Sequence, residues 1–134
     1  MKRLTFPKSA RLLNNGQFRT VLGRKVAASG RLLTLFVAEN ECGHPRLGVS
    51  IGRTAGTAVV RNRLKRLVRE AYRLNQQQIP QGWDYVVMLS PRFLRQLKSE
   101  TGKAAVKNLT FEQVENSFLT LIEEIGQSER IKVK

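Results

Sequence analysis

The 134-residue sequence has few of the residues from which enzyme sites and membrane anchors are usually built. It contains one Cys, one His and one Trp, and only 10 Asp and Glu. A single Cys cannot form an internal disulfide, so nothing indicates an oxidising compartment. No apolar run approaches the roughly 20 residues that a transmembrane helix needs, and the basic N-terminus lacks the apolar core of a secretory signal. These absences predict a soluble cytoplasmic protein.

The shortage of acidic residues also argues against a protein that cleaves bonds by itself. Asp84 is the only Asp and the Glu residues are scattered, whereas a two-metal nuclease needs clustered carboxylates. His44 precedes Pro45 in a predicted turn, with no obvious partner for acid–base work. Cys42 has no second ligand with which to hold a metal. We interpret both as loop residues, and we predict neither a catalytic residue nor a metal site in this chain.

Positive charge is what the sequence has in excess. Lys and Arg number 24, the formal net charge is +14 and the pI is about 11.1. Residues 1–75 contain 16 basic and 3 acidic side chains, whereas residues 76–134 contain 8 and 7. Like charges repel in a compact fold, and a polyanionic partner would relieve that repulsion. The distribution favours nucleic acid as the partner; a merely solubilising charge and a membrane surface are the alternatives.

Hydrophobic patterning predicts a single α+β domain over residues 1–134, with flexible tails at about 1–13 and 126–134. Apolar residues make up 41% of the chain, enough for one core. A single-layer sheet of about four strands would carry the helices, in the order helix, strands, helix, strand, helix. The expected elements are a helix from Asn14 or Asn15 to Gly23, strands at 25–29, 31–39 and 46–52, a helix at 57–77, a strand at 84–90, a short helix from Pro91, a surface loop over ETGKAAVKN and a final helix after Thr110. The strand at 84–90 is nearly continuous in apolar residues, so we expect it to be central in the sheet.

The predicted helix at 57–77 segregates its charges. At 100° per residue, Arg61, Lys65 and Arg69 follow one another along one face. Six basic residues accompany one acid, Glu70, between positions 61 and 73. Solvated helices usually mix signs, so this pattern favours a polyanion-binding face, although a membrane surface or calmodulin also suits a basic amphipathic helix. The opposite face, which we expect to pack in the core, carries Val60, Leu64, Leu67, Ala71 and Leu74.

One face of the predicted sheet carries small residues. In RLGVSIG, apolar residues alternate with Gly48 and Ser50, which leave room for something to lie against the sheet. Close packing by the protein's own elements is the alternative, and it is the more usual reason for Gly in a strand. Phe36 lies among small and polar neighbours on its strand, where a base could stack on it. Ordinary core packing of Phe18 and Phe36 is equally open.

The run AVVRNRLKRLVREAYR resembles the signature of the bacterial ribonuclease P protein component. That motif is Ala, two residues, Arg-Asn-Arg, an aliphatic residue, Lys-Arg, two residues and a basic residue, and Ala58 to Arg69 match it without a gap. LGVSIGR resembles the family strand that ends in a basic residue, here Arg53, and FPKSARLLNNGQF resembles the family's opening. The resemblance covers about residues 3–90, and the last helix loosely. Leu22 stands where an aromatic is frequent, and the segment 97–108 is longer than usual.

The resemblance implies a fold and a function. The fold would be the ribonuclease P protein sandwich, similar to the second domain of ribosomal protein S5. The protein, a monomer within the ribonucleoprotein, would assist a catalytic RNA that removes the 5′ leader of precursor tRNA with Mg²⁺, and would bind no cofactor itself. A small basic ribosomal protein is the alternative. The implied RNA-binding residues are Arg53, Arg61, Asn62, Arg63, Lys65, Arg66, Arg69 and Arg73; the implied leader groove contains Phe18, Leu22, Phe36, Gly48 and Ser50.

Overall fold

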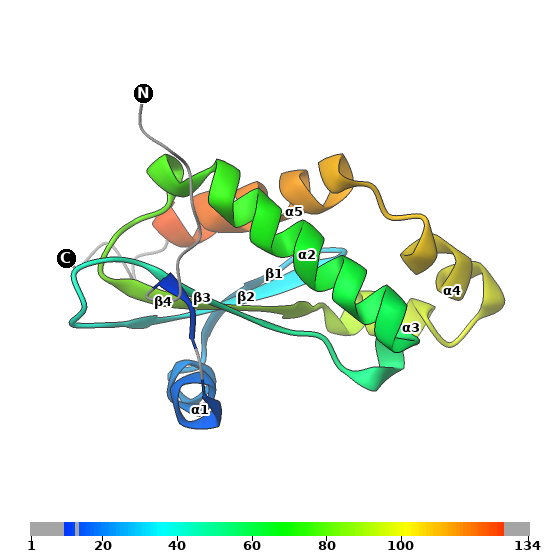
Figure 1. Ribbon diagram of the computed structural model, residues 1–134, viewed down its shortest axis with the longest axis horizontal. Coiled ribbons are helices and arrows are strands. Elements are labelled where there is room, and N and C mark those ends of the chain that lie inside the picture. The colour runs from blue at the N-terminus through cyan, green and yellow to red at the C-terminus, as the bar shows by residue number, and fades with distance from the viewer. Residues whose placement is uncertain (1–9, 13, 128–134) are drawn as a thin grey trace.

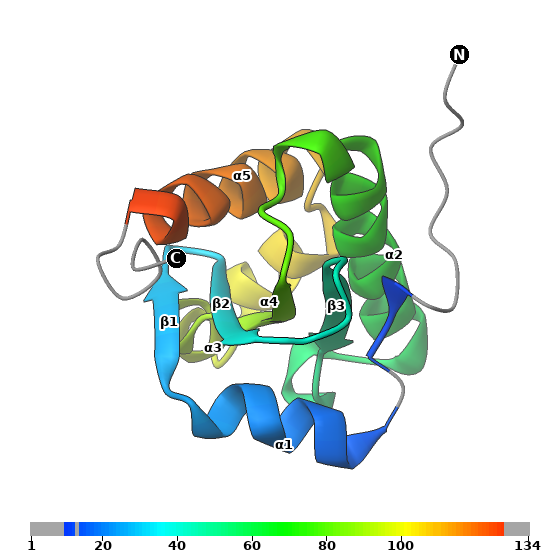
Figure 2. The same ribbon diagram turned by 90° about the vertical axis from the view of Figure 1, so that its left-hand side faces the viewer.

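A four-stranded sheet with helices on both faces forms the protein (Figures 1 and 2). The computed structural model describes residues 10–12 and 14–127. No helix in this part of the chain is long and apolar enough to cross a membrane. The elements are α1 (Asn15–Gly23), β1 (Val26–Ser29), β2 (Leu33–Glu39), β3 (Arg46–Ser50), the 3₁₀ turn η2 (Arg53–Ala55), α2 (Ala58–Leu74), the 3₁₀ turn η3 (Gln76–Gln78), β4 (Trp83–Leu89), α3 (Pro91–Gln96), α4 (Glu100–Lys107) and α5 (Phe111–Gln127).

The strand order in the sheet is β1-β2-β4-β3. β2 pairs antiparallel with both β1 and β4, whereas β3 pairs parallel with β4. A parallel pair needs a crossover, and α2 supplies it between β3 and β4. β2 and β4, whose sequences are nearly continuous in apolar residues, take the two inner positions, where both faces are covered. The prediction that the strand at 84–90 is central is confirmed.

The helices divide unequally between the two faces of the sheet. Figure 1 shows α2 and α5 on one side and α1 alone on the other. The main core lies beneath α2 and α5, where the rings of Tyr72 and Phe118 stand 6.4 Å apart. Burial in that core raises the pKa of both Tyr72 and Tyr85. A smaller cluster lies under α1, around the buried Val21 and Val86.

Local sequence signals set the helix ends where the sequence predicts them. The Asn14 side chain accepts the backbone N–H of Gln17 at 2.9 Å, and the Gln17 side chain accepts that of Asn14 at 3.3 Å. Thr110 and Gln113 make the same reciprocal pair before α5. Ser90 caps α3 by accepting the Phe93 N–H at 3.1 Å. Each cap satisfies backbone donors that a helix start otherwise leaves without a partner.

The surface loop expected over ETGKAAVKN is wrong, because this segment forms α4. Ser99 caps it by accepting the N–H of Gly102 at 3.0 Å. Gly102 is buried, and a Cβ built on it would lie 1.7 Å from the backbone O of Gln96. Glycine lowers helix propensity, which is why the sequence suggests a loop. Here, however, the missing side chain lets α4 press against the end of α3.

The structure describes residues 10–12 of the expected N-terminal tail and residues 126 and 127 of the expected C-terminal tail. Arg11 pairs with Leu47 at the edge of β3, and the Leu12 N–H donates to the Leu47 carbonyl at 3.0 Å. Leu12 is only 6% exposed. At the other end, α5 continues to Gln127. The rest of the predicted tails, residues 1–9, 13 and 128–134, lies outside the described residues.

An ion pair at the end of the sheet holds β3 to β4. Arg46 donates to both carboxylate oxygens of Asp84, at 2.7 and 2.6 Å, and Asn40 donates to the same carboxylate at 2.7 Å. The pKa of Arg46 is raised, chiefly by these hydrogen bonds, although burial opposes the shift. Asn40 also donates to the His44 carbonyl at 3.1 Å. The only Asp of the chain therefore fastens the turn between β2 and β3.

Replacing Asp84 with Asn should destabilise the protein, because Arg46 would keep its charge in a mostly buried site. We expect a loss of roughly 2–4 kcal/mol in the free energy of unfolding, measured in urea. Glu100→Gln is the matched control, since it removes a carboxylate that pairs with Lys103 at 3.5 Å on an exposed surface. Such pairs contribute little. Equal stabilities for the two variants would show that the Arg46 pair is not a structural clamp.

Candidate nucleic-acid interface

Helix α2 carries the predicted interface, and its other side anchors it to the core. Thr57 caps the helix by accepting the Val60 N–H at 3.4 Å. The predicted apolar face is only partly correct: Val60 and Leu67 are half-buried and Leu74 is 41% exposed. The buried side chains lie further round the helix, because α2 packs against both α5 and β3. They are Leu64, Val68, Ala71 and Tyr72.

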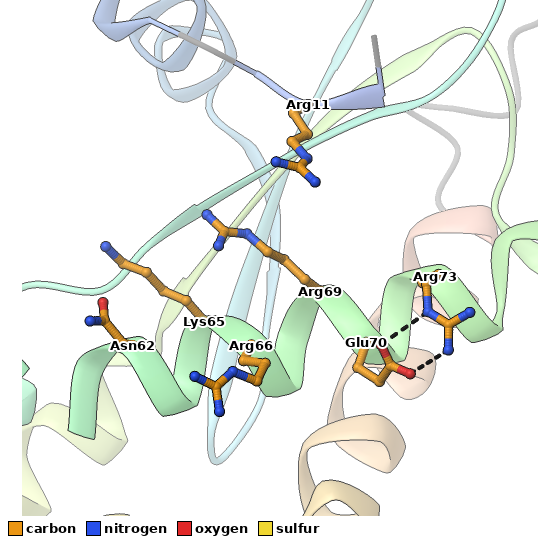
Figure 3. Close-up of a pocket in the computed structure, with 7 residues that line it drawn as sticks. All are labelled: Arg11, Asn62, Lys65, Arg66, Arg69, Glu70 and Arg73. Carbon is orange, nitrogen blue, oxygen red and sulfur yellow. Dashed lines mark hydrogen bonds and ion pairs between the residues drawn. The ribbon is translucent and has the colours of Figure 1, made fainter. Parts of the chain in front are cut away.

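The exposed side of α2 forms a basic ridge together with one residue from the N-terminal segment. We define the basic ridge as Arg11, Lys65, Arg66 and Arg69. These side chains line a cavity of about 370 Å³ with Asn62, Glu70 and Arg73. Figure 3 shows Lys65 and Arg69 extending from the helix towards Arg11. Cations on opposite sides of an open cavity can grip a phosphate between them.

Arg11 is the ridge residue that sequence reasoning missed. Its segment lies along β3 through the bridge to Leu47. Successive side chains of an extended segment point to opposite sides. Leu12 is buried in the cluster under α1, so Arg11 points towards α2 instead. In the sequence, a basic residue is followed by an apolar one shortly before Asn14. This pattern predicts an outward-facing Arg11 only if the segment is known to pair with the edge of β3.

Arg73, another predicted RNA-binding residue, forms an ion pair with Glu70 on the same helix. Its Nε donates to Glu70 at 3.0 Å, and a second guanidinium nitrogen bonds the other carboxylate oxygen. This pairing lowers the pKa of Glu70 and raises that of Arg73. The pair closes one end of the cavity shown in Figure 3 and offsets one of its positive charges.

The three residues of the Arg-Asn-Arg motif point in different directions. Arg63 donates to the Leu109 carbonyl and so ties α2 to the segment before α5. Among the described residues, Nη1 of Arg63 and Nε of Arg61 are buried without a hydrogen-bond partner. Asn62 is exposed beside the basic ridge. Arg53 is exposed in η2, just before α2 begins. RNA binding by these residues, and by Lys65, Arg66, Arg69 and Arg73, stays a prediction.

On the opposite face of the sheet, Phe18 fills the space that Gly48 leaves. A Cβ built on Gly48 would lie 2.5 Å from Cζ of Phe18 and 3.1 Å from Cδ1 of Leu12. Gly48 is buried under these two side chains. The expectation that Gly48 leaves room for a ligand is therefore wrong, and the alternative of close packing is confirmed. The glycine instead lets α1 approach the sheet.

The other predicted groove residues gather around this contact. We call Phe18, Leu22, Phe36 and Met88 the α1 cluster; all four are half-buried and pack around Val86 and its neighbours. Met88 was missed, although its place in the YVVML alternation puts it on this face. Ser50 is half-buried and lies directly beside Met88 in the strand register. The cluster offers partly exposed apolar and aromatic surface next to a hydroxyl.

The remaining polar residues singled out in the sequence form no further site. His44 Nδ1 lies 3.2 Å from the Cys42 carbonyl in the β2–β3 turn, and Cys42 is exposed. Asp84 is committed to Arg46 and Asn40. In the described part of the chain, no group of three or more His, Cys, Asp or Glu side chains could hold a metal ion.

The fold and the basic ridge together define a small α+β domain with one strongly basic face, of the kind that binds nucleic acid. The model of the ribonuclease P family matches residues 6–126, and that span contains both the basic ridge and the α1 cluster. The chain therefore belongs to the ribonuclease P protein family.

Named relatives agree with this assignment. A ribonuclease P protein component from Clostridium botulinum (strain Langeland) is 42% identical over 80 residues, which are 59% of this chain and 72% of the relative. One from Clostridium kluyveri is 36% identical over 118 residues, or 87% and 94% of the two chains. The solved RNase P protein from Thermotoga maritima has a TM-score of 0.70 at 26% identity, covering 85% of this chain and 96% of its own. These matches support the family over the ribosomal alternative.

The contact between Phe18 and Gly48 predicts a test of how α1 is placed. Gly48→Ala should lower the free energy of unfolding by roughly 1–3 kcal/mol, because the new methyl group overlaps the Phe18 ring. Adding Phe18→Leu should cost less than the sum of the two single changes, since the residues are in direct contact. Gly52→Ala is the control, because a Cβ there meets nothing within 4 Å. A Gly48→Ala protein as stable as this control would contradict the packing.

Proposed function

We propose that the chain acts as the protein component of a ribonuclease P, an endoribonuclease, and that it partners the RNA subunit of that enzyme. In this role it assists removal of the 5′ leader from precursor tRNA. The family match over residues 6–126 carries the proposal. The basic ridge supports it physically, because closely spaced guanidinium groups bind the phosphates of a folded RNA.

The two faces of the sheet suit two different parts of an RNA complex. The basic ridge offers charge and hydrogen-bond donors, which recognise a phosphate backbone whatever its sequence. The α1 cluster offers aromatic and apolar surface, on which unpaired bases stack. We therefore assign the ridge to the RNA subunit and the α1 cluster to the single-stranded leader. The protein, acting as a monomer, would then contact precursor tRNA on the side away from the ridge.

Hydrolysis itself is assigned to the RNA. The side chains of this interface are mainly cations and apolar groups, which bind and orient RNA, and its one carboxylate, Glu70, is paired with Arg73. Asp84, the only Asp, is held in its ion pair with Arg46. The protein's contribution is electrostatic: cations between two polyanions lower the repulsion that opposes their association. Mg²⁺ would serve the reaction on the RNA, and the protein would reduce how much of it is needed.

The deciding experiment is precursor tRNA cleavage at low magnesium, with a bacterial ribonuclease P RNA, with and without this protein. We expect the protein to stimulate cleavage only when the RNA is present. Lys65→Gln with Arg69→Gln should weaken the stimulation, because two ridge charges are lost. The exposed pair Arg24 and Lys25, changed to Gln together, is the matched control. Cleavage by the protein alone, or no stimulation with several bacterial RNAs, would overturn the proposal.

Leader binding by the α1 cluster predicts a selective defect. Phe36→Leu keeps an apolar side chain under α1 but removes the aromatic ring. Stacking of a base contributes about 1–3 kcal/mol, so affinity for precursor tRNA should fall between roughly 5-fold and 150-fold. Binding of mature tRNA, which lacks the leader, should hardly change. The measurement is equilibrium binding of both RNAs to the reconstituted enzyme, and equal losses for the two would remove the leader assignment.

A further inference from the structure

A second basic surface lies on α3 and α4, apart from the basic ridge. The stretch from Pro91 to Asn108 contains five basic residues and one acid, Glu100. The whole C-terminal part of the chain, residues 76–134, contains only 8 basic residues against 7 acidic ones. Five of these 8 basic residues therefore lie in this one segment. We call it the α3–α4 corner; its cations, all exposed, are Arg92, Arg95, Lys98, Lys103 and Lys107.

The α3–α4 corner is firmly anchored, so the backbone that carries its cations has a defined position. Phe93, Leu97 and Val106 are each no more than 5% exposed and belong to the main core. Gly102 brings the first turn of α4 against the backbone of Gln96. A loop would lose conformational freedom when it bound a partner, whereas this surface is already ordered.

Most of the positive charge in the corner is not offset. Lys103 lies 3.5 Å from Glu100, with side chains 58% and 93% exposed, and such a pair is weak. The other four cations have no acidic partner among the described residues. Helix α5 shows the opposite composition, with four Glu and no Lys or Arg. Neighbouring helices that separate their signs in this way produce a directional field, which a merely solubilising surface does not need.

The corner adjoins the end of α2 at which that helix begins. The bond from Arg63 to the Leu109 carbonyl joins α2 to the residues that follow α4. Figure 1 shows α3 and α4 at the end of the molecule where α2 begins, with α1 across the sheet from α2. A folded RNA lying along the ridge could therefore reach the corner, whereas a leader held under α1 would lie on the other side of the sheet.

We propose that the α3–α4 corner is a second phosphate-binding surface, and that it contacts the RNA subunit through Arg92, Arg95, Lys98 and Lys107. The proposal rests on the proposed function, because it takes the RNA subunit as the polyanion. The corner binds backbone phosphates without reading bases, since Lys and Arg side chains on an exposed convex surface offer charge but no pocket. The corner extends the protein's contact surface with the RNA. A second contact of this kind also fixes the orientation of α2 on the RNA.

The test compares binding of the full-length protein to the RNA subunit alone over a range of salt concentrations. Arg95→Gln with Lys98→Gln removes two corner charges, and Arg24→Gln with Lys25→Gln removes the same two residue types elsewhere. Each phosphate contact contributes about 0.7–0.9 to the slope of log affinity against log salt. The corner variant should therefore have a slope shallower by roughly 1.4–1.8, and bind roughly 25- to 60-fold more weakly at 0.1 M salt. All four residues are exposed, so thermal unfolding should be unchanged.

The outcomes separate the two proposals. A loss with the corner variant that clearly exceeds the control supports the corner. A loss equal to the control overturns it. A loss seen only in precursor tRNA binding to the assembled enzyme overturns the assignment to the RNA subunit and gives the corner to the substrate. In each of these cases the proposed function is judged separately, from the wild-type protein. It stands if the wild-type protein binds the RNA subunit and stimulates cleavage.

Discussion

Burial of one side of α2 is the interaction on which the rest of the structure depends. Leu64, Val68 and Tyr72 lie in the core between the sheet and α5. Each large apolar side chain contributes about 1.5–3 kcal/mol when fully buried. Repulsion between like charges one helical turn apart costs only about 0.2–0.5 kcal/mol per pair. Burial of the apolar side chains therefore outweighs the repulsion among the cations on the exposed side of α2. Binding of a polyanion would relieve that repulsion, which favours such a partner.

The sheet separates two different surfaces because its inner strands are apolar on both faces. One face supports the helix that presents charge, and the other supports α1 with its aromatic and apolar side chains. Gly48 determines how closely α1 packs on the second face, because only a residue without a side chain leaves room for the Phe18 ring so close to β3. Asp84, which looks like a candidate for chemistry in the sequence, instead clamps β3 to β4 through Arg46. The only Asp of the sequence thus has a structural role, and the abundant cations are left to form the exposed surface.

The Arg-Asn-Arg motif shows why contiguous residues need not share a role. Neighbours on a helix point about 100° apart. Arg63 therefore reaches the Leu109 carbonyl on one flank, while Asn62 faces solvent beside the ridge. Part of the motif holds α2 to the rest of the fold, and part faces outward. Arg11, far away in sequence, completes the ridge because its segment pairs with β3. The surface consists of residues that are neighbours in space, and the motif supplies only some of them.

The sequence by itself determined the α+β class, most element bounds, the central position of β4 and the helix that carries the charge. These features depend on local periodicity, capping residues and composition, which act over a few neighbouring residues. Only the tertiary structure decided that ETGKAAVKN is helical, that Arg11 joins the ridge, that Val68 and Tyr72 are buried while Leu74 is exposed, and that Phe18 fills the space at Gly48. Each of these depends on contact with another element of the fold: α3, β3, α5 or the sheet. Local propensity carries no information about such contacts, because their energy comes from surfaces that meet only after the chain has folded.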